Sequence, residues 1–155
     1  MKTYCKNIYK LCREAAWTNQ DVAADLLGVS IRSLSDYETG KTIPPEDVVC
    51  RMVEIYNSPI LAYMHLKTNN EVGRRFLPEI RVDNLSEAVL RLQMNKHSLD
   101  SIEPQIVQIA CDGIIDENEI PIWTQVRTEM EQMASSVMSL LFIPEKRERP
   151  LKAAL

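Results

Sequence analysis

Residues 20–41 read QDVAADLLGVSIRSLSDYETGK, and this stretch decides the fold of the first half of the chain. Gly28 is typical of the end of one short helix, and Ser30 is typical of the residue that caps the next helix, which Gly40 ends. Only Val29 separates Gly28 from Ser30, so the two helices must cross at a steep angle. Such a pair is a helix-turn-helix.

Further helices are predicted on both sides of this pair. Residues 7–16 carry apolar side chains at helical spacing, which predicts a first helix there. Pro44-Pro45 and Ser58-Pro59 are each typical of a helix start, and they predict a fourth and a fifth helix. We therefore expect a five-helix domain over residues 1–67, followed by a connector at residues 68–81.

A heptad pattern dominates the second half of the chain. Apolar residues recur three and four positions apart on both sides of Asp112-Gly113, with one polar interruption at Asn95. This pattern predicts an antiparallel hairpin of helices over residues 82–143, before a flexible tail at residues 144–155. The expected residues of the hairpin core, or of a contact between two copies, are Leu92, Leu99, Ile106, Trp123, Met130 and Val137.

Pro104 interrupts the first helix of the predicted hairpin. Proline removes a backbone hydrogen bond, so the sequence predicts either a kink there or a restart capped by Ser101. With either outcome the whole chain is predicted to be all-α.

Composition agrees with an all-α chain and excludes several other classes. The 155 residues are 45% hydrophobic and 26% charged, and their four glycines are too few for an all-β fold rich in tight turns. The four cysteines form no C-x-x-C pair, so a metal site has no support. No signal peptide and no apolar run long enough to cross a membrane is evident, so we expect a cytoplasmic protein without a membrane partner.

The charge is divided unevenly between the two halves of the chain. Residues 1–81 hold 11 Lys and Arg against 10 Asp and Glu, a net charge of +1. Residues 82–155 hold 7 against 12, a net charge of −5, so the acidity belongs to the predicted hairpin. A chain of this kind can bind nucleic acid through a few placed contacts rather than through bulk charge.

Two further patterns argue against metal binding and catalysis. Residues 112–119, DGIIDENE, match the second half of a calcium-binding EF-hand loop, but Ala110 stands where an earlier ligand is needed. We interpret Asp116 and Glu119 instead as a cap for the next helix. No catalytic arrangement of side chains and no Gly-rich phosphate loop is evident, so we expect no enzyme activity and no cofactor.

Residues 20–41 resemble the DNA-binding helix-turn-helix of the phage repressor and Cro family, often called Xre-type regulators. The resemblance extends over about residues 7–66 and implies a five-helix, lambda-repressor-like fold, binding to double-stranded DNA, and a bacterial or phage origin. In this family the residues that match Arg13 and Glu38 form an ion pair, so the resemblance implies that pair here. The residues that carry the resemblance in the first helix and the turn are Gln20, Asp21, Ala23, Ala24, Leu26, Leu27, Gly28, Val29 and Ser30, and in the recognition helix and the exit turn they are residues 31–38, Gly40 and Lys41.

The second helix of the pair is expected to place its N-terminal end in the major groove of DNA. Leu34 and Tyr37 share one face of this helix and should be buried, which leaves the other face for the bases. Arg32 can donate two hydrogen bonds to guanine, and Ile31 can contact the methyl group of thymine. The expected base-reading residues are Ile31, Arg32, Ser35 and Asp36, where Asp36 must accept from cytosine or orient Arg32, because phosphates repel its carboxylate.

Contacts to the DNA phosphates should position this helix. Gln20 starts the preceding helix, where unpaired backbone N–H groups also favour an anion. The expected phosphate contacts are Thr18, Asn19, Gln20, Ser33, Lys41 and Thr42.

These observations predict a sequence-specific regulator of transcription. A homodimeric repressor on a palindromic operator is the expected form, because two half-sites add affinity and specificity. An alternative is an antitoxin, or another regulator, whose hairpin docks a protein partner such as a toxin or an antirepressor. A third hypothesis is an interaction module that does not bind DNA.

Overall fold

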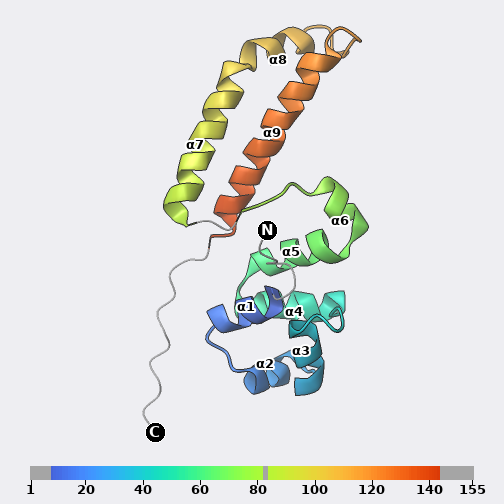
Figure 1. Cartoon of the computed structure of the whole chain (residues 1–155), viewed down its shortest axis with the longest axis vertical. Helices are drawn as coiled ribbons and strands as arrows, with labels where there is room; N and C mark the ends of the chain where they lie inside the picture. Colours follow the sequence, from blue (N-terminus) through green and yellow to red (C-terminus); the bar gives the residue numbers. More distant parts are fainter. Residues whose placement is uncertain (1–7, 82–83, 144–155) are drawn as a thin grey trace. The chain divides into compact units, whose positions relative to one another are not determined.

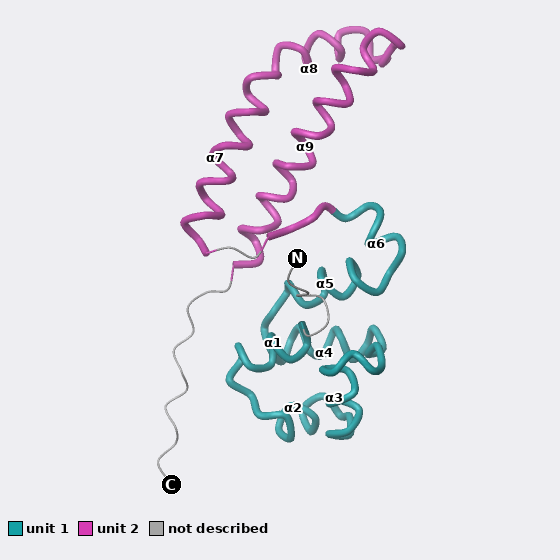
Figure 2. Tube along the Cα trace, viewed as in Figure 1, with its two compact units in different colours: residues 1–77, 144–155 teal, residues 78–143 magenta. Residues whose placement is uncertain are grey.

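The computed structural model describes residues 8–81 and 84–143, and each regular element in these ranges is an α-helix (Figure 1). The predicted all-α fold class is confirmed. The described chain divides into two compact units, an N-terminal unit that ends at Leu77 and a C-terminal unit that begins at Pro78 (Figure 2). The tail predicted at residues 144–155 lies outside the described residues.

Short turns join the helices of the N-terminal unit. The expected order of five helices is present, although the fifth continues to Asn69 and a sixth follows it. The helices are α1 (Ile8–Ala15), α2 (Gln20–Leu27), α3 (Ile31–Glu38), α4 (Glu46–Tyr56), α5 (Pro59–Asn69) and α6 (Glu71–Phe76).

The turn between α2 and α3 follows from three consecutive residues. Gly28 adopts a left-handed backbone conformation, with φ 67° and ψ 33°, and ends α2. Val29 donates its N–H to the carbonyl oxygen of Ala24 at 3.0 Å. Ser30 then caps α3, because its hydroxyl oxygen accepts the N–H of Ser33 at 3.0 Å. A positive φ costs glycine little, so this turn depends on Gly28.

The core of the N-terminal unit lies where α1 to α5 converge. Leu34 is fully buried there and fixes the inner face of α3. Removal of these apolar side chains from water is the main stabilising contribution to the unit. The buried core residues are Tyr9, Cys12, Ala23, Ala24, Leu27, Leu34, Val48, Val49, Met52, Tyr56 and Leu61.

Residues 68–81 differ from the predicted connector. The side-chain oxygen of Asn70 accepts the N–H groups of Val72 at 2.8 Å and Gly73 at 3.3 Å, and this cap starts α6. At Gly73 the backbone of α6 approaches α5 so closely that a Cβ atom would overlap the carbonyl oxygen of Leu66. The N-terminal unit therefore extends beyond the predicted boundary at residue 67 and ends at Leu77. Asn70 starts the additional helix, and the close contact at Gly73 packs it against α5.

The described part of the C-terminal unit contains α7 (Leu85–Ser101), α8 (Glu103–Ala110) and α9 (Ile120–Leu141). α7 and α9 lie side by side and antiparallel, as expected for a hairpin (Figure 1). The first half of the hairpin breaks at Ile102, which occupies the N-cap position of α8 without a side-chain cap bond, and Pro104 lies in the first turn of α8. The expected cap at Ser101 is wrong, since its hydroxyl donates to the carbonyl oxygen of Ser98 at 2.6 Å.

A polar contact lies inside this hairpin. Asn95 Nδ2 donates to the carbonyl oxygen of Gln132 at 3.0 Å and to the hydroxyl of Ser136 at 2.6 Å. Ser136 is fully buried. These bonds fix how far α7 is displaced along α9. The buried apolar residues of the described hairpin are Ala88, Ile102, Ile109 and Val126.

The predicted hairpin core requires a correction. Met130 and Val137 are 40% and 39% exposed, so neither belongs to the core of a single hairpin. The apolar stripe that contains them lies on one flank of the hairpin, beside the line where α7 meets α9. The other predicted core residues are half-buried: Leu92, Leu99, Ile106 and Trp123.

The turn before α9 uses its acidic residues as predicted. Asp116 Oδ1 accepts the N–H of Glu119 at 3.0 Å, and Glu119 Oε2 accepts the N–H of Asp116 at 3.1 Å. This reciprocal pair is a capping box. The described residues contain no cluster of three His, Cys, Asp or Glu side chains that could hold a metal ion.

Candidate nucleic-acid interface

The N-terminal end of α3 is open to solvent. Ile31 is 54% exposed and Arg32 is exposed, whereas Leu34 on the opposite face is fully buried. Tyr37 was expected to be buried like Leu34, but it is half-buried at the edge of the core. The structure therefore presents Ile31 and Arg32 together on the outer side of the helix.

Three polar residues of α3, Ser33, Ser35 and Asp36, are bonded to the cap of the helix or to the residues that follow it. The Ser33 hydroxyl lies 2.8 Å from the Ser30 hydroxyl, at the cap of α3. The carbonyl oxygen of half-buried Ser35 accepts the Thr39 hydroxyl at 2.8 Å. Asp36, which was expected to read a base or to orient Arg32, forms an ion pair with Lys41 at 3.1 Å.

The loop after α3 is held close to the helix by Asp36. Its carbonyl oxygen accepts the backbone N–H groups of Lys41 at 2.9 Å and Thr42 at 3.3 Å. Lys41 and Thr42 are exposed, and so is the next residue, Ile43. Ile43 was not predicted from the sequence as a residue of the site. A β-branched apolar residue between a polar loop and a proline pair is the signal that could have identified it.

The N-terminal end of α2 lies beside the C-terminal end of α3. Gln20 begins α2, and its Nε2 donates to Glu38 Oε2 at 3.0 Å. The carbonyl oxygen of Thr18 accepts Arg13 Nη1 at 2.9 Å, and exposed Asn19 occupies the N-cap position of α2 without a side-chain cap bond. The structure therefore brings the expected phosphate-binding residues of α2 to the same end of the unit as the last turn of α3.

An ion pair implied by the resemblance joins α1 to α3. Arg13 Nε lies 2.5 Å from Glu38 Oε1, and Arg13 Nη2 lies 2.9 Å from Glu38 Oε2. Both side chains are buried, and hydrogen bonding to Glu38 raises the pKa of the Arg13 guanidinium against the opposing effect of burial. Because Glu38 also accepts from Gln20, one carboxylate links α1, α2 and α3. This brace fixes the position of α3 on its support.

A second buried polar cluster, not identified from the sequence, lies between α1 and α5. The Tyr9 hydroxyl lies 2.8 Å from His65 Nδ1, and Asn69 Nδ2 donates to the Tyr9 hydroxyl at 3.1 Å. Burial lowers the pKa of His65 and raises the pKa of Tyr9. The helical spacing of His65 and Asn69, one turn apart, is the signal that could have indicated their shared face.

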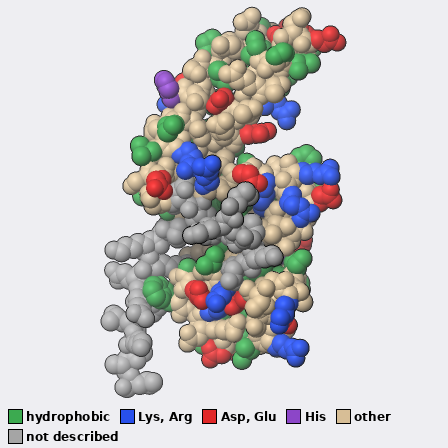
Figure 3. Space-filling view, in the orientation of Figure 1, with side chains coloured by type: hydrophobic (Ala, Val, Ile, Leu, Met, Phe, Trp, Pro, Cys, Tyr) green, Lys and Arg blue, Asp and Glu red, His purple; other side chains and the backbone are tan. Residues whose placement is uncertain are grey.

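The surface charge of the N-terminal unit is mixed rather than uniformly basic. Figure 3 shows Lys and Arg side chains on the face in view, both over α6 and over the part of the unit that contains α3, with acidic side chains between them. Around α3 the exposed cations are Arg32 and Lys41. An anionic partner would thus be attracted to this face by a small number of cationic side chains, and their positions on and beside α3 would determine its orientation.

Comparison with known proteins gives a family match within the N-terminal unit. Residues 10–60 match the family model of a helix-turn-helix domain, which spans α1 to the start of α5. A search of curated proteins and a search of solved structures each found no match. The matched residues therefore form a helix-turn-helix domain, which supports a DNA-binding regulator. No helix among the described residues is both long and apolar enough to cross a membrane.

Proposed function

We propose that this protein is an Xre-type, sequence-specific DNA-binding regulator of transcription that acts as a homodimeric repressor on a palindromic operator. One observation carries the proposal. The helix-turn-helix exposes Ile31 and Arg32 at the N-terminal end of α3, while buried Leu34 and the Arg13–Glu38 brace hold that helix in place. A helix supported in this way can enter the major groove without rearrangement of the domain.

Base reading is assigned to the open end of α3. The Arg32 guanidinium can donate two parallel hydrogen bonds to the O6 and N7 atoms of guanine, a contact worth about 1–3 kcal/mol of discrimination against other bases. Ile31 can contact the methyl group of a neighbouring thymine. Ser35 lies one turn further along the helix and is half-buried, so its hydroxyl reaches a base only at the edge of the contact.

Phosphate contacts are assigned to the two segments that flank α3. Thr18, Asn19 and Gln20 lie at the start of α2, where the first backbone N–H groups of the helix also favour an anion. Lys41 and Thr42 lie in the loop after α3. Contacts on both sides of the recognition helix would fix its register without adding sequence information.

A single domain of this size buries little DNA surface, which favours a dimer on two half-sites. Two-fold symmetry would place the half-sites about 10–10.5 base pairs apart, or a multiple of that distance. In the alternative form of the proposal, the C-terminal unit docks a toxin or an antirepressor.

Selection of bound sequences from random DNA, followed by fluorescence anisotropy at two salt concentrations, tests the proposal. We expect one palindromic sequence to be enriched and Arg32→Ala to weaken its binding by about 10- to 100-fold. Arg127→Ala removes an exposed arginine of α9 and serves as the control, with binding unchanged. Absence of saturable binding to any selected sequence at low salt would overturn the proposal.

A further inference from the structure

The first four helices of the N-terminal unit end in the same kind of turn. In each turn a residue just beyond the helix adopts a left-handed backbone conformation, and two backbone hydrogen bonds close the turn. This arrangement is the Schellman motif. The left-handed residues are Trp17 after α1, Gly28 after α2, Gly40 after α3 and Asn57 after α4, with φ values of 56°, 67°, 74° and 45°.

Trp17 is the exceptional member of this set. Glycine has no Cβ atom and adopts a positive φ readily, and asparagine tolerates it better than most residues. A bulky side chain makes the left-handed conformation unfavourable, because its Cβ atom approaches the following carbonyl oxygen. The turn is nevertheless closed at Trp17, whose N–H donates to the Glu14 carbonyl oxygen at 3.0 Å, and the Thr18 N–H donates to that of Arg13 at 3.3 Å. Glycine would adopt this conformation at lower cost.

Burial in the core does not compensate for the unfavourable conformation of Trp17. The side chain is 57% exposed, whereas the preceding residue, Ala16, packs against the core of the N-terminal unit. A tryptophan that remains largely in water gains little from the hydrophobic effect. Stability therefore does not account for tryptophan at this position, and a strained backbone of this kind is typical of a functional site.

Trp17 lies beside the residues to which phosphate contacts are assigned. Gln20, the first residue of α2, follows three positions later, so the Cα atoms of these two residues are at most about 11 Å apart. The Arg13 guanidinium donates to the Thr18 carbonyl oxygen and to the Glu38 carboxylate, which joins this corner to the last turn of α3. A DNA strand that contacts the start of α2 would therefore pass within reach of Trp17.

The charged side chains at this corner do not favour an anion. Glu14 on α1 is paired with Lys10 at 3.8 Å, and Asp21 adds a negative charge to the first turn of α2. A phosphate at this corner must therefore be bound by uncharged donors. The indole of tryptophan is such a donor, since it combines one N–H group with a large apolar face that can pack on a sugar ring.

We propose that Trp17 is a positioning residue for DNA: its indole N–H donates to a phosphate oxygen, and its ring packs on the adjoining sugar. The proposal rests on the DNA-binding function proposed above, and it adds a contact that carries no charge and reads no base. The closed turn after α1 fixes the backbone of Trp17 before DNA binds, so less ordering is required on binding.

Trp17→Gly tests the proposal, because binding should weaken without a loss of stability. Glycine relieves the left-handed conformation, so we expect the midpoint of thermal unfolding, followed by circular dichroism, to rise or to stay unchanged. The affinity for the selected DNA sequence, measured by fluorescence anisotropy, should fall about 5- to 20-fold. Asn57→Gly makes the same replacement in the equivalent turn after α4 and is the control, with DNA affinity unchanged.

Two results with Trp17→Gly would overturn the proposal. One is an affinity equal to that of the unchanged protein. The other is a lower unfolding midpoint, which would show that Trp17 stabilises the fold instead.

The form of the affinity loss identifies the contact. Since a phosphate and sugar contact reads no base, Trp17→Gly should weaken binding to matched and mismatched DNA by the same factor. The dependence of affinity on salt concentration should stay unchanged, because tryptophan carries no charge. Trp17→Phe keeps an aromatic ring without the N–H, so its affinity should lie between those of Trp17→Gly and the unchanged protein. A loss confined to one base position would assign Trp17 to base reading and overturn the backbone contact.

Tryptophan emission provides a direct readout of the contact. In Trp123→Phe protein Trp17 is the only tryptophan, and added DNA should shift its emission to shorter wavelengths, because the contact excludes water from the indole. Unchanged emission while anisotropy shows binding would overturn the assignment of Trp17 and leave the DNA-binding function intact. Absence of DNA binding by the unchanged protein would instead overturn the proposed function, and the assignment with it.

Discussion

Lys41 forms an ion pair with Asp36, at 3.1 Å between Nζ and Oδ1, directly beyond the residues of α3 that are assigned to base reading. The Asp36 backbone carbonyl also accepts the N–H groups of Lys41 and Thr42. Asp36 therefore acts on the loop after α3 through its side chain and its backbone together. This geometry favours a role in positioning Lys41 over direct contact with a base.

Replacement of Asp36 by asparagine separates these two roles. We expect Asp36→Asn to strengthen binding to matched and mismatched DNA alike, because it removes a negative charge close to the phosphates and releases the charge of Lys41. The dependence of the logarithm of affinity on the logarithm of salt concentration should become steeper by about one unit. Anisotropy titrations at several salt concentrations measure both quantities. Weaker binding at a cytosine-containing position alone would show that Asp36 reads that base.

The Arg13–Glu38 brace predicts a large loss of stability when one partner is removed. Glu38→Ala leaves the Arg13 guanidinium buried without its carboxylate, and such changes cost about 3–5 kcal/mol. Urea unfolding followed by circular dichroism measures the free energy of unfolding. Glu14→Ala, an exposed glutamate on α1, is the control and should change it by less than about 0.5 kcal/mol. An unchanged unfolding midpoint in Glu38→Ala would contradict the prediction.

The Tyr9–His65–Asn69 cluster predicts a loss of stability in mild acid. Burial lowers the pKa of His65 in the folded state, while the nearby Glu46 carboxylate raises it by a smaller amount. The unfolded chain therefore binds a proton first, and stability falls as the pH drops below the ordinary histidine value of about 6.5. It levels off once the pH passes below the folded pKa.

This dependence is checked by urea unfolding of the protein, followed by tryptophan fluorescence, at several pH values from about 8 to about 5. The free energy of unfolding is compared across the series. His65→Gln should flatten the pH dependence, whereas His97→Gln, an exposed histidine of α7, should leave it unchanged. A pH profile that is the same in the unchanged protein and in His65→Gln would show that other groups cause it.

The close contact at Gly73 predicts that α6 can pack on α5 only with glycine at this position, because any side chain there would meet the backbone of α5. Gly73→Ala would place a methyl group against the Leu66 carbonyl oxygen, which belongs to the backbone and cannot rotate away. We expect a loss of about 1–3 kcal/mol in the free energy of unfolding. Val72→Ala on the same helix is exposed and is the control. Equal stability in Gly73→Ala and Val72→Ala would show that the two helices can separate at little cost.

Local signals made the helix-turn-helix predictable. Gly28 and Ser30 act on their immediate neighbours, so the turn between α2 and α3 could be predicted from residue types alone. The same holds for the capping box of Asp116 and Glu119. The Arg13–Glu38 pair came from the resemblance, since the two residues are 25 positions apart and no local rule brings them together.

The features that could not be predicted depend on contacts between distant segments. α6 was taken for a connector because six residues that include Gly73 carry a weak helical signal on their own. The heptad pattern identified the apolar stripe of α9 correctly, but it could not show which part of the stripe α7 covers. Rotation of the two helices about their axes decides that, and it leaves Met130 and Val137 uncovered.

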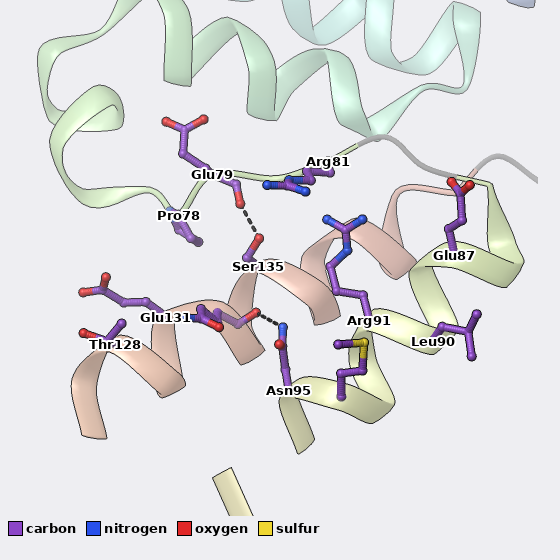
Figure 4. A pocket seen from close by; sticks show the side chains of 12 residues that line it. Pro78, Glu79, Arg81, Glu87, Leu90, Arg91, Asn95, Thr128, Glu131 and Ser135 are labelled. Atoms are coloured by element: carbon purple, nitrogen blue, oxygen red, sulfur yellow. Dashed lines mark hydrogen bonds between the residues drawn. The ribbon is translucent and has the colours of Figure 1, made fainter. Parts of the chain in front are cut away.

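Each unit holds its own end of the chain at the point where the two units meet in sequence. Lys67 Nζ donates to the Leu77 carbonyl oxygen at 2.5 Å in the N-terminal unit, and Ser135 donates to the Glu79 carbonyl oxygen in the C-terminal unit (Figure 4). Pro78 alone lies between Leu77 and Glu79 in the sequence. A chain divided at Pro78 would lose neither hydrogen bond, so the helix-turn-helix unit can be prepared and titrated with DNA apart from the hairpin.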